Sequence, residues 1–257
     1  ESIPSHDTFN RFFSALNPEY FERIFRHWMF EICEKYEGVV AIDGKTIRGA
    51  SKCTSSHPAG NPGFKLHMVS AWATANGISL GQLKVNEKHN EIVAIPLLLE
   101  ALDLTGCLVT IDAMGCQTDI AKKKIECGAD YVLALKENHR NLYNTVKGWF
   151  DDLDKKNIDV NKAYYATRYG KYITEEEAHG KHERRECLVY SCQALTGMLK
   201  DWKGLKAVVR ISSQRTIRTT GETTVNHRFY ITSLGLEPQR RRRQKNGQCG
   251  TECFTYE

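Results

Sequence analysis

Two short apolar segments of the sequence each run into an aspartate, and this feature constrains the fold most. Residues 107–111 form a run of β-forming side chains that stops at Asp112, and residues 39–42 form a similar run that stops at Asp43. In open α/β sheets, binding sites form at the carboxyl ends of the strands. If the two segments are neighbouring parallel strands, both carboxylates lie at the same end of one sheet.

The spacing of apolar residues between 37 and 155 predicts strands that alternate with helices. Asn76-Gly77 is a strong hairpin signal, with strands expected at 65–75 and 78–85. Helical periodicity then alternates with further apolar strands. The expected helices are 91–104, 117–127 and 139–154, and the expected strands are 107–111 and 131–135. This order predicts an α/β fold with a mixed sheet.

The segments on either side of this core have a different pattern of apolar and polar residues. Residues 1–36 predict a helical lead-in that docks on the core, with a helix start at Asn17-Pro18-Glu19. Residues 156–234 predict a β-rich continuation, in which the polar segment TEEEAHGKHERRE separates two strands. The expected strands there are 163–173, 186–193, 205–212 and 224–233. The tail 235–257 has no apolar period and carries a four-arginine run, so we expect it to be disordered.

Composition narrows the class of protein. The net charge of +5 permits a polyanionic partner such as DNA. No apolar run approaches the roughly 20 residues that span a bilayer, and no secretory signal opens the chain, so we expect a cytoplasmic protein and no membrane partner. The nine cysteines form no CxxC pair, which favours reduced thiols. The chain begins at Glu1 rather than at Met, and we expect a segment upstream of it.

The two aspartates define the candidate chemistry. Neighbouring carboxylates repel unless a cation lies between them, and Mg²⁺ prefers such hard oxygen ligands. Two ions roughly 3.5–4 Å apart can clamp the attacking and leaving oxygens of a phosphoryl displacement, usually with a third carboxylate. The alternative is ordinary turn chemistry, because Asp-Gly follows strands in many turns and Asp112 could cap the next turn. The residues alone leave both interpretations open.

Three long segments resemble a known family. AIDGKTIRGA, GQLKVNEKHNEIVAIPLLLEALDLTGCLVTIDAMGCQTDIA and YVLALKENH are similar to the ISAs-type bacterial insertion-sequence transposases, which include the H-repeat-associated proteins. HGKHERRE resembles a further family segment, with Lys181 in place of an arginine. The resemblance covers residues 1–234. It implies an RNase H-like fold and a DDE active site with two Mg²⁺ or Mn²⁺ ions, in which Asp43 and Asp112 are the first two catalytic and metal-binding acids. Gly115 would let the backbone turn away behind Asp112.

The third acid of the family, a glutamate in a His-Trp-x-x-Glu-Asn motif, has no counterpart after FYITSLG. We therefore expect a C-terminus that is truncated or frame-shifted, and strongly reduced cleavage. The resemblance implies a DDE transposase that cleaves and joins DNA strands. The alternatives are a DNA-binding remnant without catalysis and, in another class, an RNase H-like host nuclease.

Basic residues near these motifs are candidates for DNA contacts. Lys45 and Arg48 flank Asp43, and Lys181 and Arg185 belong to the family segment that we place near DNA. A solvated turn is the alternative for the first pair. Residues 122–124, three consecutive lysines, predict the solvated face of a helix. Members of the family act as multimers on paired DNA ends, so the oligomeric state stays open, and the expected location is the bacterial cytoplasm, on the nucleoid when DNA is bound.

Overall fold

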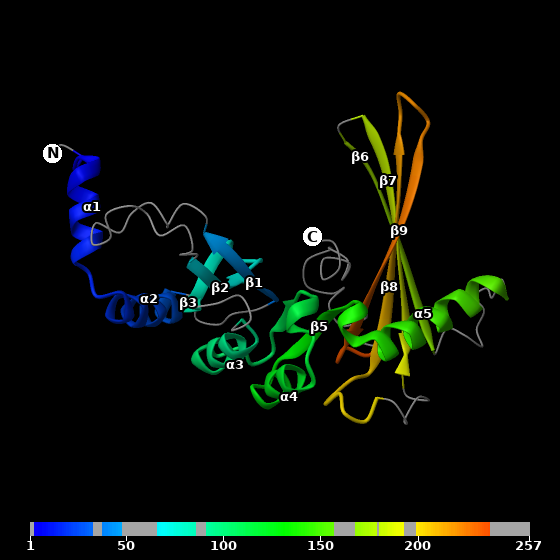
Figure 1. Ribbon diagram of the computed structural model, residues 1–257, viewed down its shortest axis with the longest axis horizontal. Coiled ribbons are helices and arrows are strands. Elements are labelled where there is room, and N and C mark those ends of the chain that lie inside the picture. Colours follow the sequence, from blue (N-terminus) through cyan, green and yellow to red (C-terminus); the bar gives the residue numbers. More distant parts are fainter. Residues whose placement is uncertain are drawn as a thin grey trace, which may run out of the picture.

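One large mixed sheet dominates the molecule (Figure 1). The computed structural model describes residues 3–32, 38–47, 66–85, 91–156, 168–178, 180–192 and 199–236. In this part of the chain, nine strands form a single sheet in the order β3-β2-β1-β4-β5-β9-β8-β7-β6. The predicted mixed α/β architecture is therefore confirmed. None of the described helices is both long and apolar enough to cross a lipid bilayer.

The first five strands make one half of the sheet. The antiparallel strands are β1 (Val39–Ile47), β2 (Leu66–Ala73) and β3 (Ile78–Val85), and the strands parallel to β1 are β4 (Leu108–Ile111) and β5 (Asp130–Leu135). The predicted hairpin between β2 and β3 is confirmed. Its Gly77 has a φ of +66°, a left-handed conformation that glycine adopts without steric cost.

Three helices cover one face of this half, which we call the helix face. They are α3 (Glu91–Ala101), α4 (Thr118–Glu126) and α5 (Arg140–Lys155). Their apolar side chains pack in one cluster with alternate strand residues, among them Val40, Ile42, Val109, Ile111 and Leu133. The strand residues between these point the other way, as the two-residue period of a strand requires.

The opposite face of the sheet, which we call the open face, has its own smaller cluster. It includes Val39 of β1, Leu108 of β4, Val132 of β5 and Val209 and Tyr230 further along the sheet. No residue of α1–α5 belongs to this cluster. The two clusters identify which strand side chains lie on which face.

The second half of the sheet is a long antiparallel ribbon. It consists of β6 (Tyr169–Ala178), β7 (Lys181–Ser191), β8 (Ala207–Ile217) and β9 (Thr223–Thr232). β9 pairs with β5, so the ribbon continues the same sheet. Figure 1 shows the ribbon extending far from the N-terminal helices, with a strong twist.

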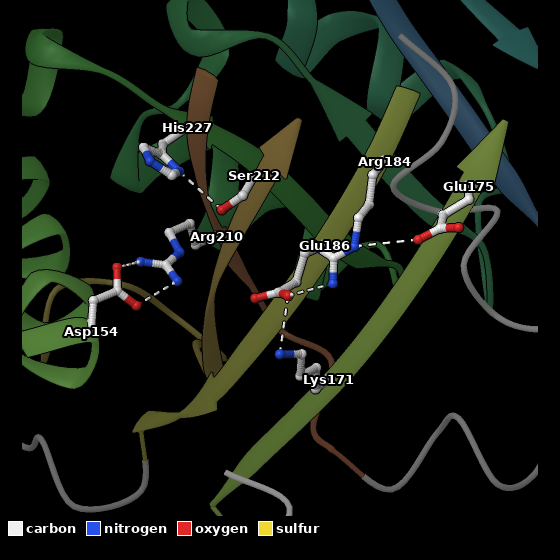
Figure 2. A network of polar contacts seen from close by, with 8 residues as sticks. All are labelled: Asp154, Lys171, Glu175, Arg184, Glu186, Arg210, Ser212 and His227. Atoms are coloured by element: carbon white, nitrogen blue, oxygen red, sulfur yellow. Dashed lines mark hydrogen bonds and ion pairs between the residues drawn. The ribbon is translucent and has the colours of Figure 1, made fainter. Parts of the chain in front are cut away.

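The polar segment that was expected to separate two strands is itself β-structure, so that expectation is wrong. β6 runs on to Ala178 and β7 begins at Lys181. Cross-strand ion pairs replace apolar packing there, because the distal ribbon has no core beside it. Figure 2 shows one such network, in which Glu186 of β7 contacts Lys171 of β6 at 3.0 Å and Arg184 of its own strand at 3.4 Å.

A second polar contact in Figure 2 fastens the ribbon to α5. Arg210 of β8 donates to both carboxylate oxygens of Asp154, at 2.6 and 3.0 Å. The Arg210 guanidinium also lies 5.2 Å from the centre of the Phe150 ring. Arg210 is 5% exposed, so its charge is desolvated and depends on this bidentate partner.

The N-terminal segment forms two helices rather than one, α1 (His6–Ala15) and α2 (Pro18–Ile32). The Asn17 side chain accepts a hydrogen bond from the Tyr20 amide at 3.0 Å, which explains the helix start that the sequence predicts. α2 contacts β3, and its Met29 is buried. Docking is otherwise slight, because much of the apolar face stays exposed, including Phe21, Ile24 and Trp28. Residues 33–36 lie outside the described part.

Candidate active site

Asp43 and Asp112 occupy neighbouring positions on two parallel strands. β1 and β4 pair in parallel up to Ile42 and Ile111, and the two aspartates are the next residues on their strands. Both are exposed. The predicted juxtaposition of the two aspartates is therefore what the strand register produces.

The strand ends differ from the prediction in one respect. β4 stops at Ile111, directly before Asp112, as expected. β1 continues through Asp43 to Ile47, because β2 remains beside it and pairs Asp43 with Ser70. The interpretation of Asp43-Gly44 as a turn is therefore wrong, and Asp43 lies where β1 loses its neighbour on the β4 side.

Both carboxylates lie on the open face. Ile42 and Ile111 belong to the helix-face cluster, whereas Val39 and Leu108 belong to the open-face cluster. Because successive side chains of a strand alternate between faces, Asp43 points to the same face as Val39. The backbone of Asp112 is extended (φ −65°, ψ 179°), so its side chain continues the alternation of β4 and points to the same face as Leu108.

Asp112 caps the turn that follows it, as the turn interpretation of this residue predicted. Capping the turn is compatible with metal binding by the same carboxylate. One carboxylate oxygen, Oδ1, accepts hydrogen bonds from the amides of Met114 at 3.1 Å and Gly115 at 3.4 Å. These amides open a short 3₁₀ helix, η3 (Ala113–Gly115). The contacts fix the orientation of the carboxylate and use only one of its two oxygens.

Gly115 lies in the turn that directly follows Asp112, as expected, and its missing side chain also permits close packing there. Its φ is not among the positive values. A Cβ at position 115 would overlap the Ile111 side chain and stand 3.3 Å from Ile95 Cδ1. The missing side chain at position 115 therefore leaves room for the Ile111 side chain of β4 beside the η3 turn.

Two further residues hold this turn, and neither was predicted to have a role. Asn138 and His139 lie in η4 (Glu137–His139), directly after β5. Asn138 Nδ2 donates to the carbonyl oxygen of Ala113 at 2.6 Å, and His139 Nε2 lies 2.5 Å from the carbonyl oxygen of Cys116. Both residues end the segment YVLALKENH, so the signal was present in the family resemblance.

The candidate DNA-contacting residues fall into three situations. Lys45 and Lys181 are exposed, and the alternation of side chains along their strands places both on the open face, as it does Asp43. Arg185 shares that face, but it is bonded to Glu183 at 3.1 Å. Burial opposes ionisation of Glu183, yet hydrogen bonds from Arg185 and then Arg215 hold its pKa below the ordinary value. Arg48 lies outside the described residues.

The three lysines of α4 do not form one solvated face, which corrects that prediction. Lys122 is exposed, and Lys123 forms an ion pair with Glu100. Lys124 is fully buried, and burial lowers its pKa well below the ordinary value. It lies near Cys116, where burial raises the pKa of the thiol to about 12.

His67 and the described cysteines can also be assigned places in the structure. His67 is buried, and its Nδ1 lies 2.8 Å from Thr46 Oγ1. None of the described cysteines, which are Cys107, Cys116, Cys127, Cys187 and Cys192, is part of a disulfide. His89, Cys249 and Cys253 lie outside the described part of the chain.

The oxygen donors of this site are of the type that binds a hard divalent cation. Asp43 and Asp112 supply carboxylate oxygens, the ligand type that Mg²⁺ and Mn²⁺ prefer. Within the described ranges, no three His, Cys, Asp or Glu side chains stand close enough together to form a preassembled metal cluster. Two carboxylates are therefore in place, and a third ligand is not assembled beside them.

Comparison with known proteins identifies the family. Residues 35–239 match the family described as the transposase DDE domain. YncI of Escherichia coli O157:H7, named as a transposase, is 39% identical over 91% of this chain and 57% of its own length. YhhI of E. coli K12, named as an H repeat-associated transposase, is 34% identical over 93% of this chain and 60% of its own length. The chain belongs to the DDE transposase family.

Two other matches add little to this family assignment. An uncharacterised protein from the dhlA 3′ region of Xanthobacter autotrophicus is 34% identical over 92% of this chain and 74% of its own length. A piggyBac transposase synaptic complex with hairpin DNA overlaps 76% of the chain with a TM-score of 0.36 and 8% identity, a likeness that supports no argument. The chain thus spans between about half and three quarters of the length of these sequence relatives.

Proposed function

We propose that this chain is the catalytic portion of an insertion-sequence transposase, which cleaves DNA at the ends of its element and joins those ends to target DNA. The observation that carries the proposal is the parallel pairing of β1 and β4. It brings Asp43 and Asp112 to neighbouring positions on one open sheet face. Membership of the DDE family supports the same chemistry.

In the proposed chemistry, Asp43 and Asp112 bind a divalent cation. A divalent cation, Mg²⁺ or Mn²⁺, would neutralise the charge that develops on the scissile phosphodiester and promote in-line displacement. Asp43 and Asp112 would hold it. The hydrogen bonds that Asp112 accepts from the η3 amides orient its carboxylate, and Asn138 and His139 keep that turn in place. The reaction would first free a 3′-hydroxyl at the element's end, which would then attack the target strand.

The sheet core is proposed to be RNase H-like. Its first five strands lie in the order β3-β2-β1-β4-β5, with an antiparallel β1–β3 meander and parallel β4 and β5. The family resemblance of the sequence implies that fold. The ribbon β6–β9 would be an elaboration of its β5 edge.

DNA is proposed to lie along the open face. Lys45 follows Asp43 on the same side of β1, and Lys181 and Arg185 occupy the same face of the ribbon. Contacts of these side chains with phosphates would position the duplex without reading its sequence. Arg48, in the same sequence motif as Lys45, is proposed to join them.

A second candidate is a DNA-binding protein without catalysis. The specific observation in its favour is that the described residues contain no preassembled cluster of three metal-ligating side chains. An RNase H-like host nuclease is disfavoured, because the whole described core matches transposases.

Cleavage of DNA that carries the terminal sequences of the parent element tests the proposal. We expect nicking that requires Mg²⁺ or Mn²⁺ and that is strongly reduced, because the third acid of the family has no counterpart after FYITSLG. We expect Asp112→Asn to abolish it, while binding of the same DNA persists. Lys122→Gln, at an exposed lysine on α4, is the matched surface control and should cleave normally. Binding without cleavage by the unsubstituted chain would instead establish the non-catalytic alternative.

A further inference from the structure

One carboxylate of the ribbon contacts two arginine side chains at once. Glu183 of β7 accepts a hydrogen bond at Oε1 from Arg185 Nε, at 3.1 Å, and one at Oε2 from Arg215 Nη2, at 3.3 Å. Arg185 is two residues further along β7, and Arg215 lies directly opposite Glu183 on β8. Cys187 of β7 and Ile211 of β8 belong to the open-face cluster, and even spacings separate them from these three residues. Since side chains alternate along a strand, all three lie on the open face.

The open face of the ribbon carries more positive than negative charge. Its two acidic and four basic side chains are Glu176, Glu183, Lys181, Arg185, Arg215 and Arg228. The network in Figure 2, on the helix face of the ribbon, has equal numbers of each: Lys171 and Arg184 with Glu175 and Glu186. Pairing that only stabilises strands gives this balanced arrangement. The surplus on the open face suits a polyanion.

Glu183 occupies only part of each arginine. A guanidinium carries five N–H donors, and Glu183 accepts from one nitrogen of each side chain. Within the described ranges, neither arginine has a further hydrogen bond or ion pair. The Arg185 and Arg215 side chains are 28% and 51% exposed, whereas that of Glu183 is 17% exposed. The remaining donors are therefore accessible to a ligand, and the carboxylate lies beneath them.

The carboxylate orients the two arginines before any ligand binds. Two guanidinium groups repel each other, and a negative charge between them offsets that repulsion. Burial alone would raise the pKa of Glu183, but the hydrogen bonds from Arg185 and Arg215 hold it below the ordinary value, so the group is charged at neutral pH. An arginine fork that is already oriented loses less conformational freedom when it binds a phosphate.

We infer that Glu183 is a positioning residue, which holds Arg185 and Arg215 as a paired contact for the phosphate backbone of DNA. The inference rests on the proposed function, because it takes DNA as the polyanion. β5 and β9 separate β7 and β8 from the strands that carry the two aspartates. The arginine pair therefore contacts DNA away from the cleavage site. Because phosphate contacts carry no sequence information, the pair strengthens binding of any duplex.

Equilibrium binding of a duplex of arbitrary sequence, with a chelator present to prevent cleavage, tests the inference. Removing a negative charge from a DNA-binding face strengthens binding by electrostatics alone. Glu183→Gln should instead weaken binding by about fivefold, because two arginine side chains must then be ordered on binding. The slope of log affinity against log salt concentration should also become shallower by about 1–2, since each lost phosphate contact reduces it by about 0.9.

Glu176→Gln is the matched control. Glu176 is exposed on the same face, directly opposite Glu183 on β6, and has no hydrogen bond or ion pair with another described residue. Its replacement removes the same charge without releasing an arginine. We expect this variant to bind DNA as tightly as the unsubstituted chain or more tightly, with an unchanged salt slope.

Arg215→Gln separates positioning from a loss of structure. It should weaken binding in the unsubstituted chain but add little in the Glu183→Gln background, because both changes remove the same contact. Binding by Glu183→Gln as tight as that of Glu176→Gln would overturn the inference and leave the proposed cleavage standing. No binding of any duplex by the unsubstituted chain would overturn both. If thermal unfolding shows that Glu183→Gln does not fold, Arg215→Gln decides alone, and unchanged binding would overturn the inference.

Discussion

Lys124 places an amine in the core with no exposed surface. Its Nζ has no hydrogen-bond partner among the described residues and lies 6.0 Å from the centre of the Tyr131 ring. In protein mutational data, burying such a polar group without a hydrogen bond costs about 1–3 kcal/mol. Lys124→Met keeps the length of the side chain and removes the amine. We therefore expect it to raise the free energy of unfolding by about 1–3 kcal/mol.

Thermal and denaturant unfolding measure this gain. At about 2–4 °C per kcal/mol for a chain of this size, the melting temperature should rise by roughly 2–12 °C. Lys122→Met, on the exposed side of the same helix, is the control and should change stability by no more than about 0.5 kcal/mol. An equal or lower stability of Lys124→Met would refute the reasoning, because it would mean that the amine has a favourable partner in the folded protein.

The pH dependence supplies a second test with a fixed sign. The folded-state pKa of Lys124 is lowered by burial, so the unfolded chain binds more protons between that pKa and the ordinary value of about 10.5. This amine therefore makes the unsubstituted chain more stable as pH rises through that window. The advantage of Lys124→Met should shrink toward pH 10. The neighbouring Cys116 and Tyr131 titrate in both proteins, so the difference between the two proteins isolates Lys124.

Three further substitutions test contacts around the site and the ribbon. Asp154→Ala leaves the buried Arg210 charge unpaired, and we expect a loss of about 1.5–3 kcal/mol in urea unfolding; an unchanged midpoint would contradict it. Gly115→Ala forces a methyl group against Ile111 and should cost about 1–3 kcal/mol in the same assay. Asn138→Ala removes the hydrogen bond that holds the turn after Asp112, and calorimetry should show Mn²⁺ affinity reduced by about tenfold with the circular dichroism spectrum retained.

The sequence was most informative where apolar periodicity and local turn chemistry set the structure. Asn76-Gly77 specified its hairpin, and the apolar runs before Asp43 and Asp112 specified two buried strands. The juxtaposition of the aspartates followed from the assumption that these strands are parallel neighbours. Nothing local predicted that β1 runs past Asp43, because its extension depends on pairing with β2.

Other features depend on contacts between distant residues. The ribbon strands beyond the core bury little, so ion pairs such as Arg184 with Glu175 took the place of an apolar alternation. Lys124 did carry a local signal, because it follows the buried Ile120 and Ala121 by four and three residues and so shares their helix face. The contact of Glu183 with Arg215 joins residues of two strands whose pairing no spacing rule predicts.

The position of a bound Mn²⁺ ion tests the central claim most directly. Crystals of the chain grown or soaked with Mn²⁺ would reveal the ion through its anomalous scattering. The account predicts a peak between the carboxylates of Asp43 and Asp112, at the end of β4, that disappears in Asp112→Asn. A peak at another place, or none with both aspartates intact and ordered, would contradict it.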